Sequence, residues 1–459
     1  MPQNLHRLHA QHGKVVRIAP HQYSIEDPDA LKIIYGRRSQ FNKSDFYAAS
    51  ELSGHPNLFS QRDPTQHDHD RKKYNFAFTT TAMTSYEEYI DDCIDLLCKR
   101  LHEQVDSAPS VDMAWWLHCF SFDVIGAISF SKRFGFLDRG QDIGRLIETI
   151  HGNAFHATVF GIFHELYPLV FRIKAILSRF GLISSSGQAF MQRFATGLLN
   201  ERRTELKTAS AAASDPSGDD NRPQDFLTKY LEKHLSSPSV FTKSDILNGL
   251  GANINAGSDT TSTTLSSILY FLHRHSATLQ TLRTEISNAQ DADLLSHPAT
   301  FKEAQSLSFL QAVIKESLRL HPAVGITLPR VVPVGGVQIA GHSFSAGEVV
   351  GISPYVAHRN PDVFGADAND FKPERWLKSH ADSETLAMME RYFLPFGAGS
   401  RSCIGRNVAL MEVTKTVTEL LRRFDFELVE KDEWKVKTWL FSMPESVNMK
   451  VTMRAEGQQ

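Results

Sequence analysis

The chain has 459 residues and a formal net charge of −3, with 41% hydrophobic and 22% charged residues. These values lie near the globular average, so they exclude global disorder and a strongly basic nucleic-acid-binding surface. The four cysteines form no Cys-x-x-Cys pair, which argues against a disulfide framework and a zinc cluster. The length suits one large enzyme fold or two to three smaller domains.

The first part of the chain, residues 1–22, is polar and rich in histidine. It contains no apolar run of the ~18 residues that a transmembrane helix needs, so we expect the chain as written to be soluble and cytoplasmic. Residues 14–25 hold two short β-prone runs around a proline and predict a hairpin. The pair Asp27-Pro28 then predicts the start of a short helix.

Residues 41–64 are rich in Ser, Asn, Gly and Pro, which predicts a long loop of the kind that forms lids and binding loops. His67 and Arg71 follow, four residues apart, so a helix would place both on one face. His69 would point to the opposite side, and no third ligand is evident. We therefore expect a solvated helix face here rather than a metal site.

The middle of the chain is predominantly helical, from residue 83 to about residue 207. The apolar run over 115–130 predicts a buried helix, and three of the cysteines lie at apolar positions typical of a core. Residues 208–223, rich in Ala, Ser and Asp, predict a flexible linker. Both a domain boundary and a surface loop between helices fit this linker.

A long helix is predicted from Thr242 to about His275, opened by a Thr-x-x-Asp capping box. From Ala256 its midpoint reads Ala-Gly-Ser-Asp-Thr-Thr, a composition that favours a bulge or kink. A buried Asp259–Thr260 pair is costly unless it is hydrogen-bonded or functional. For these two residues alone, a satisfied polar patch is the commoner explanation.

Glu316 and Arg319 stand three residues apart in a predicted helix and can pair on one face, which by itself says little. Residues 331–353 alternate β-branched residues with glycine turns and predict a small sheet. A Phe-Lys-Pro-Glu-Arg-Trp run containing Arg375 follows.

The strongest signal is residues 396–405, Phe-Gly-Ala-Gly-Ser-Arg-Ser-Cys-Ile-Gly. Here Cys403 lies in a glycine turn before a helix, where backbone N–H groups and the helix dipole stabilise a thiolate. The glycines allow a flat ligand to approach the backbone, and the Arg401 guanidinium suits a carboxylate. A buried structural cysteine is the alternative, and the complete spacing disfavours it.

The spacing Phe-x-x-Gly-x-Arg-x-Cys-x-Gly resembles the haem-ligand loop of the cytochrome P450 superfamily, whose cysteine thiolate ligates iron. The Ala-Gly-x-Asp-Thr-Thr run resembles the family's oxygen-activation motif, and the Glu-x-x-Arg and Pro-Glu-Arg motifs resemble its buried Glu-Arg-Arg cluster. The resemblance spans nearly the whole chain. It implies a mainly α fold with a smaller β region (α+β), a triangular prism with a long central helix over the haem. It also implies that residues 1–459 form a single catalytic domain.

The resemblance implies haem b as cofactor and a role for each matched residue. The metal ligand would be Cys403, in a cofactor loop that includes Phe396 and Gly405. The groups that reach the haem propionates would be Arg401, Arg330, His67 and Arg71. The catalytic pair that relays protons to dioxygen would be Asp259 and Thr260. The substrate-pocket residues would be Ala256, Val324, Leu328 and Phe441, and the structural triad would be Glu316, Arg319 and Arg375.

The implied function is a haem-thiolate monooxygenase that inserts one oxygen atom of dioxygen into a small apolar organic substrate. Hydroxylation, or dealkylation and further oxidation after it, would serve fungal secondary metabolism or detoxification. The sequences of residues 16–20 and 41–44 resemble those of filamentous-fungal microsomal members such as the pisatin-demethylase-like group. The expected electron donors are NADPH-cytochrome P450 reductase and cytochrome b5, with Lys72, Lys73 and Arg406 as docking candidates.

Such members are anchored at the cytoplasmic face of the endoplasmic reticulum membrane by an N-terminal helix that this sequence lacks. We therefore expect membrane association for the full-length form only. Two other functions are weighed: a reductase-independent haem-thiolate isomerase or dehydratase, whose relatives tend to lack the acid–alcohol pair, and a non-enzymatic haem sensor.

Overall fold

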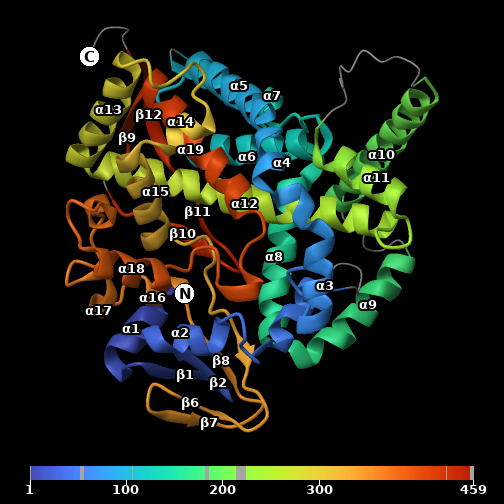
Figure 1. Ribbon diagram of the computed structural model, residues 1–459, viewed down its shortest axis with the longest axis vertical. Coiled ribbons are helices and arrows are strands. Elements are labelled where there is room, and N and C mark those ends of the chain that lie inside the picture. Colours follow the sequence, from blue (N-terminus) through green and yellow to red (C-terminus); the bar gives the residue numbers. More distant parts are fainter. Residues whose placement is uncertain are drawn as a thin grey trace.

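Helices form most of the molecule, and small sheets form the rest (Figure 1). The predicted fold class, mainly α with a smaller β region, is confirmed. One long helix, α12 (Lys243–Arg274), crosses the middle of the molecule. Most of the predicted linker lies outside the described residues, and its start belongs to α10 (Ser186–Ala212). The computed structural model describes residues 2–51, 56–105, 107–180, 186–212, 224–430 and 432–454.

The largest sheet joins distant parts of the chain in the order β1-β2-β8-β5-β3. The predicted hairpin is its first pair, since β1 and β2 run antiparallel. Strand β3 pairs antiparallel with β5, and this register places Lys43 directly opposite Arg330. The strands are β1 (Val15–Ala19), β2 (Gln22–Ile25), β3 (Asn42–Lys43), β5 (Arg330–Val331) and β8 (Val349–Gly351).

The prediction of one long loop over 41–64 is wrong for its first part. It contains β3 and the 3₁₀ helix η1 (Asp45–Ser50). Local sequence could not predict the strand, because its hydrogen-bonding partner lies almost 300 residues away in β5. Residues 52–55 lie outside the described residues.

Helix α6 (Met113–Phe130) is the buried helix that the apolar run predicted, since nearly all of its side chains from Leu117 onward are buried. Asp112 caps its N-terminus by accepting hydrogen bonds from the backbone of Ala114 and Trp115. Within the described residues, only this helix is long and apolar enough to cross a membrane, and 89% of it is buried inside the fold. Its packing partner is α12, so it serves the protein core.

The central helix α12 begins as predicted, with a reciprocal capping box between Thr242 and Asp245. The predicted bulge near its midpoint is not observed, because the backbone stays α-helical throughout. Instead, the hydroxyl of Ser258 donates to the carbonyl of Ile254, and other hydroxyls of the run bond back in the same way. These hydroxyl groups are therefore satisfied within the helix, and the helix stays regular.

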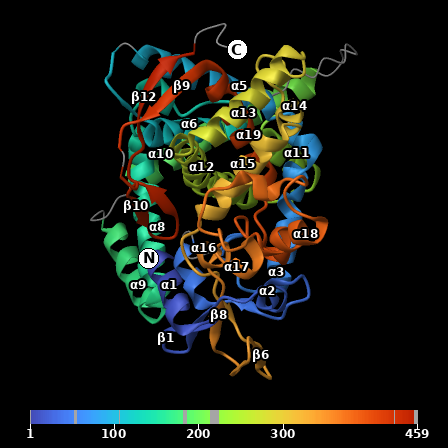
Figure 2. The same cartoon turned by 90° about the vertical axis from the view of Figure 1, so that its left-hand side faces the viewer.

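The remaining elements complete the helical body and three smaller sheets (Figures 1 and 2). The N-terminal half adds α1 (Pro2–His12), α2 (Pro28–Tyr35), α3 (Pro64–Tyr74), η2 (Asn75–Phe78), α4 (Thr80–Thr84), α5 (Glu87–Val105), β4 (Val111–Asp112), α7 (Phe136–Arg139), η3 (Ile143–Arg145), α8 (Leu146–Ile162), η4 (His164–Leu166), α9 (Tyr167–Arg179) and α11 (Phe226–Ser236). The C-terminal half adds α13 (Ser276–Asp291), α14 (Phe301–Gln305), α15 (Ser308–Leu320), β6 (Val337–Ile339), β7 (His342–Phe344), α16 (Pro354–Ala357), α17 (Pro361–Phe364), η5 (Pro373–Trp376), α18 (Ser383–Tyr392), η6 (Gly399–Arg401), α19 (Arg406–Arg423), β9 (Phe424–Leu428), β10 (Val436–Thr438), β11 (Ser442–Pro444) and β12 (Asn448–Met453).

Candidate functional site

The Cys403 loop is a tight turn between η6 and the start of α19, as the sequence predicts. The backbone N–H of Cys403 donates to the carbonyl of Phe396 at 2.8 Å, which closes the turn. Gly399 has a φ of +63°, and a Cβ there would collide with the carbonyl oxygen of Tyr35. Glycine at this position is therefore required both by the backbone conformation and by the contact with α2.

The Cys403 side chain is solvent-accessible although protein surrounds it on most sides. Burial raises the pKa of its thiol, while N–H groups of Gly405 and Arg406 and the charge of Arg71 lower it. The start of the helix therefore stabilises the thiolate, as expected. In the haem-free protein, however, burial raises the pKa of the thiol by more than these groups lower it. A cationic centre bound to the sulfur would reverse that balance.

Helix α3 places His67 and Arg71 on one face, as predicted, and turns His69 outward. The solvated-face expectation is correct for His69 and wrong for His67, which is buried. Arg71 donates from Nη1 to the carbonyl of Ser402 at 2.6 Å, so α3 braces the Cys403 loop directly.

Two further arginines are held in place by backbone carbonyls. Arg401 donates to the carbonyl of Gln61 at 2.6 Å, and Arg330 donates to the carbonyl of Pro329 at 3.0 Å. Lys43, which the sequence analysis missed, is buried opposite Arg330 and donates to the carbonyl of Phe59. We call Lys43, His67, Arg330 and Arg401 the basic quartet.

The members of the basic quartet repel one another. Burial, then the charges of Arg330 and Arg401, holds the pKa of Lys43 far below its ordinary value. Burial, then Arg401 and Lys43, lowers the pKa of His67 to about 3. Burial and Arg330 lower the pKa of Arg401 to about 10. Among the described residues, no member of the quartet forms an ion pair with a carboxylate, so the site favours an external anion.

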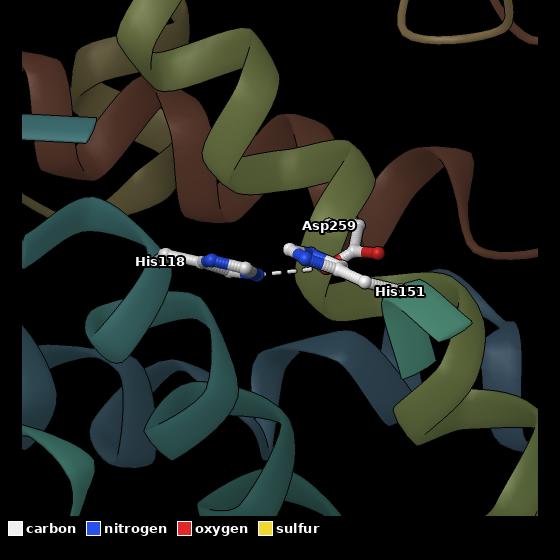
Figure 3. A group of neighbouring side chains, drawn as sticks. All are labelled: His118, His151 and Asp259. Atoms are coloured by element: carbon white, nitrogen blue, oxygen red, sulfur yellow. Dashed lines mark hydrogen bonds and ion pairs between the residues drawn. The ribbon is translucent and has the colours of Figure 1, made fainter. Parts of the chain in front are cut away.

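The acid–alcohol pair lies on α12, with Asp259 buried and Thr260 half-buried. The hydroxyl of Thr260 donates to the carbonyl of Ala256 at 2.7 Å, which leaves its oxygen able to accept. Two histidines that sequence reasoning missed lie beside Asp259, His118 from α6 and His151 from α8 (Figure 3). Burial alone would raise the pKa of Asp259, but hydrogen bonds and charges from these histidines outweigh it and hold the pKa below its usual range.

The structure brings the three residues of the predicted triad together around the Glu316 carboxylate. Arg319 donates to it twice at 2.8 Å, and Arg375 donates once at 3.0 Å. The indole N–H of Trp376 adds a bond of 2.9 Å, and so does the backbone N–H of Lys372. Every negative oxygen of this buried carboxylate is therefore matched by donors of the same network.

Comparison with known proteins decides the family. A model of the cytochrome P450 family matches residues 1–451. The chain is 34% identical over 439 residues to "Pisatin demethylase" of Fusarium vanettenii, covering 95% of this chain and 81% of the relative. It is also 34% identical over 454 residues to "Cytochrome P450 monooxygenase gsfF" of Penicillium aethiopicum, covering 97% and 87%. The chain belongs to the cytochrome P450 family. It is a haem-thiolate monooxygenase whose cofactor is haem b.

The residues of this cytochrome P450 fit its cofactor. Haem b is a flat macrocycle with an iron at its centre and two carboxylates at its edge. The basic quartet would supply hydrogen-bond donors and positive charge for the carboxylates, and Cys403 would supply an accessible soft sulfur ligand for iron. The family also implies an organic substrate, dioxygen and a redox partner.

Of the four predicted pocket residues of the cytochrome P450, the structure joins two. Val324 and Phe441 form an antiparallel bridge and pack with the buried Ala154, Ile326 and Leu440. Leu328 packs instead against the cluster beneath the large sheet, where its carbonyl accepts from the Tyr35 hydroxyl at 2.7 Å. Ala256 is exposed although it lies at the midpoint of the core helix α12.

Proposed function

We propose that haem b binds between α12 and the Cys403 loop, with Cys403 as the iron ligand, and that residues 1–459 act as one catalytic domain. The observation that carries this placement is the basic quartet. Its four basic side chains, three of them buried and that of Arg401 half-buried, form no ion pair with a carboxylate among the described residues, and two haem carboxylates would balance the cluster. When bound, haem b supplies the iron centre at which dioxygen is activated and split.

The protein positions this group through the residues around it. Lys43, Arg330 and Arg401 pair with the carboxylates, and His67 donates to them from the same face of the site. Arg71 fixes the loop through the Ser402 carbonyl and directs its positive charge toward the sulfur of Cys403. Phe396 accepts the N–H of Cys403 and so holds the sulfur in one orientation, while Gly405 keeps side-chain atoms away from it.

The acid–alcohol pair controls protons on the other side of the site. Asp259 is the proton-holding group: it is ionised at rest, because the histidines lower its pKa, and it holds a proton only during transfer. Thr260 orients that proton through the free lone pairs of its hydroxyl. We expect Thr260→Ala to keep substrate binding while it releases more hydrogen peroxide per NADPH. A haem sensor has no such coupling to lose, so unchanged peroxide release would favour that alternative.

The substrate of this proposal is a small apolar organic molecule, processed in fungal secondary metabolism or detoxification. Support comes from the apolar cluster of Val324 and Phe441 with Ala154, Ile326 and Leu440, and from the exposed Ala256 on α12. Such surfaces bind by burial of apolar area, and they provide no charged anchor. Hydroxylation is the first product-forming step, with dealkylation following where the attacked carbon bears oxygen or nitrogen.

Cys403→Ser tests the whole assignment. The wild-type protein should show the far-red absorption shift of a thiolate haem under carbon monoxide after reduction, and the serine variant should lack it. Product formation should require both dioxygen and NADPH. If turnover proceeds in the absence of both dioxygen and NADPH, the protein is a reductase-independent isomerase or dehydratase and not a monooxygenase.

We further propose that the redox partner is an NADPH-cytochrome P450 reductase, assisted by cytochrome b5, and that it docks beside the Cys403 loop. Lys72 and Arg406 are exposed there, on α3 and at the start of α19. Lys73, the third predicted docking residue, is largely covered and pairs with Asp245 at 3.1 Å. The docking surface therefore rests on Lys72 and Arg406 rather than on Lys73.

An exposed apolar surface supports a place at the endoplasmic reticulum membrane. Helix α9 lies at the edge of the molecule in both views, and the turn η4 joins it to α8 (Figures 1 and 2). Phe163 and Ile176 are 54% and 56% exposed, and so many exposed large apolar residues close together in the sequence are unusual. Leu169→Glu should reduce flotation with phospholipid vesicles. These residues include Phe155, Ile162, Phe163, Leu166, Leu169, Ile173 and Ile176.

A further inference from the structure

Two histidines converge on the buried carboxylate of Asp259 from separate helices. Nε2 of His118 lies 2.7 Å from Oδ1 of Asp259, and Nε2 of His151 lies 3.5 Å from the same oxygen. The two imidazole rings stack with centroids 5.3 Å apart and an angle of 16° between their planes. Figure 3 shows both rings on one side of the carboxylate, with its other oxygen directed away from them.

The three groups form a gradient from an accessible position to a buried one. The His151 side chain is 35% exposed, that of His118 is 11% exposed, and that of Asp259 is fully buried. Oδ2 of Asp259 is buried and has no hydrogen-bond partner within the described residues. An unpartnered, buried carboxylate oxygen is costly, so its persistence points to a transient partner.

A structural carboxylate in this protein looks different. Glu316 is enclosed, and both of its oxygens accept hydrogen bonds, from Arg319 on its own helix and from Arg375 and Trp376 on η5. Asp259 is hydrogen-bonded on one oxygen only, by His118, and the second imidazole, that of His151, lies 3.5 Å from the same oxygen. Imidazoles are the side chains that exchange protons most readily near neutral pH. The site is therefore arranged to pass a proton through Asp259 rather than only to bury its charge.

We propose that His151 and His118 are the proton-input residues of this enzyme and recharge Asp259 from solvent during turnover. The inference rests on the proton-holding role of Asp259 in the proposed function. A protonated imidazole transfers its Nε2 proton to Oδ1 of Asp259. The carboxyl group then rotates about its Cβ–Cγ bond, releases that same proton toward Thr260 and returns to the carboxylate. The imidazole regains a proton from water, so charge and proton count are restored in each cycle.

The test compares His151→Gln, His118→Gln and the control His156→Gln, with reductase, NADPH and 7-ethoxycoumarin as an apolar probe. His156 lies on the same helix as His151 but contacts Phe160 and Tyr167. Dioxygen uptake, hydrogen peroxide release and product are measured in H₂O and D₂O. The ratio of hydrogen peroxide released to dioxygen consumed can be measured even if the enzyme does not oxidise the probe.

We expect the fraction of dioxygen released as peroxide to rise in both variants and the NADPH-driven rate to fall about tenfold or more. The solvent isotope effect on that rate should grow, which a merely structural role would not produce. Peroxide-driven turnover and the carbon monoxide spectrum should remain as in the wild type. In the haem-free protein, Asp259→Asn should shift the imidazole ¹⁵N signals of both histidines.

Asp259→Asn distinguishes the input role of the two histidines from the proton-holding role of Asp259. If it uncouples the enzyme while both histidine variants behave like His156→Gln, the input role is wrong and the role of Asp259 stands. If Asp259→Asn leaves coupling intact, the proposed function of Asp259 itself fails. His118 is buried, so His151→Gln, at a more exposed position, decides the matter if His118→Gln does not fold.

The three groups also have the composition of a divalent-cation site, since their ligand atoms all lie within 4.8 Å of one another. Treatment of the wild-type enzyme with EDTA tests this. Coupling that falls with EDTA and returns with Zn²⁺ would overturn the proton-input role in favour of a metal site. Coupling that EDTA leaves unchanged supports the relay.

Discussion

Two buried charged clusters in this molecule differ in how their charges are balanced. Around Glu316, the carboxylate and two guanidinium groups close on one another, and Asp367 pairs with Arg375 at 2.9 Å. In the basic quartet, four basic side chains lie together, and none of them pairs with a carboxylate within the described part of the chain. The charges of the first cluster are balanced within the protein, whereas those of the second would be balanced by the carboxylates of the proposed haem.

This difference assigns the roles of the two clusters without reference to sequence motifs. A buried network whose charges balance one another stabilises the fold, whereas a buried cluster of like charges is suited to bind a ligand of opposite charge. In the proposed site, the two haem carboxylates would remove the repulsion within the basic quartet. Removal of one charged group should therefore destabilise the protein in the Glu316 cluster and stabilise the haem-free protein in the basic quartet.

The largest effect is expected from Glu316→Gln. The substitution leaves Arg319 and Arg375 buried with too few acceptors, and loss of one partner from such a network costs about 3–5 kcal/mol. Chemical denaturation of the haem-free protein measures the free energy of unfolding. Glu390→Gln, which breaks the exposed pair with Lys315, is the control and should cost about 0–1 kcal/mol. Equal costs for the two variants would contradict the structural role of the Glu316 network.

Lys43→Met should stabilise the haem-free protein but weaken the retention of haem. In the haem-free protein it removes a buried, repelled charge and should stabilise the fold by about 1 kcal/mol or more. In the haem-loaded protein it removes a partner of a carboxylate, so haem should transfer faster to an acceptor such as apomyoglobin. Destabilisation of the haem-free protein together with unchanged haem retention would show that Lys43 is only structural.

His67 should make the haem-free protein acid-sensitive. Its pKa in the folded protein is about 3, below the ordinary value of 6.5, because of burial and then the neighbouring cations. Below pH 6.5 the unfolded chain therefore binds a proton that the folded chain refuses, and stability falls as the pH drops toward 3. His67→Asn should reduce the slope of unfolding free energy against pH in this window. An unchanged slope would mean that His67 protonates freely in the folded protein.

The Cys403 loop and the Glu316 network could be predicted because their residues occur in short motifs with fixed spacing. Lys43 could not, because its role depends on the register between β3 and β5, which local sequence does not encode. His118 and His151 were missed for a similar reason, since only the packing of α6 and α8 on α12 brings them to Asp259. The predicted bulge in α12 failed because the hydroxyl groups bond back along their own helix.

The smallest effect is expected on the surface, where charges are neither buried nor fixed. The Lys72 side chain is 72% exposed, and among the described residues its one ion pair is with Asp68, so Lys72→Glu should leave stability nearly unchanged. It should slow reductase-driven turnover a few-fold at low salt, because surface charge acts mainly on the rate of encounter, and high salt should shrink the difference. Peroxide-driven turnover should not change, since it needs no partner protein. Lys73→Glu is the contrasting variant: it should lower stability through Asp245, and equal losses in both assays for Lys72→Glu would remove Lys72 from the docking surface.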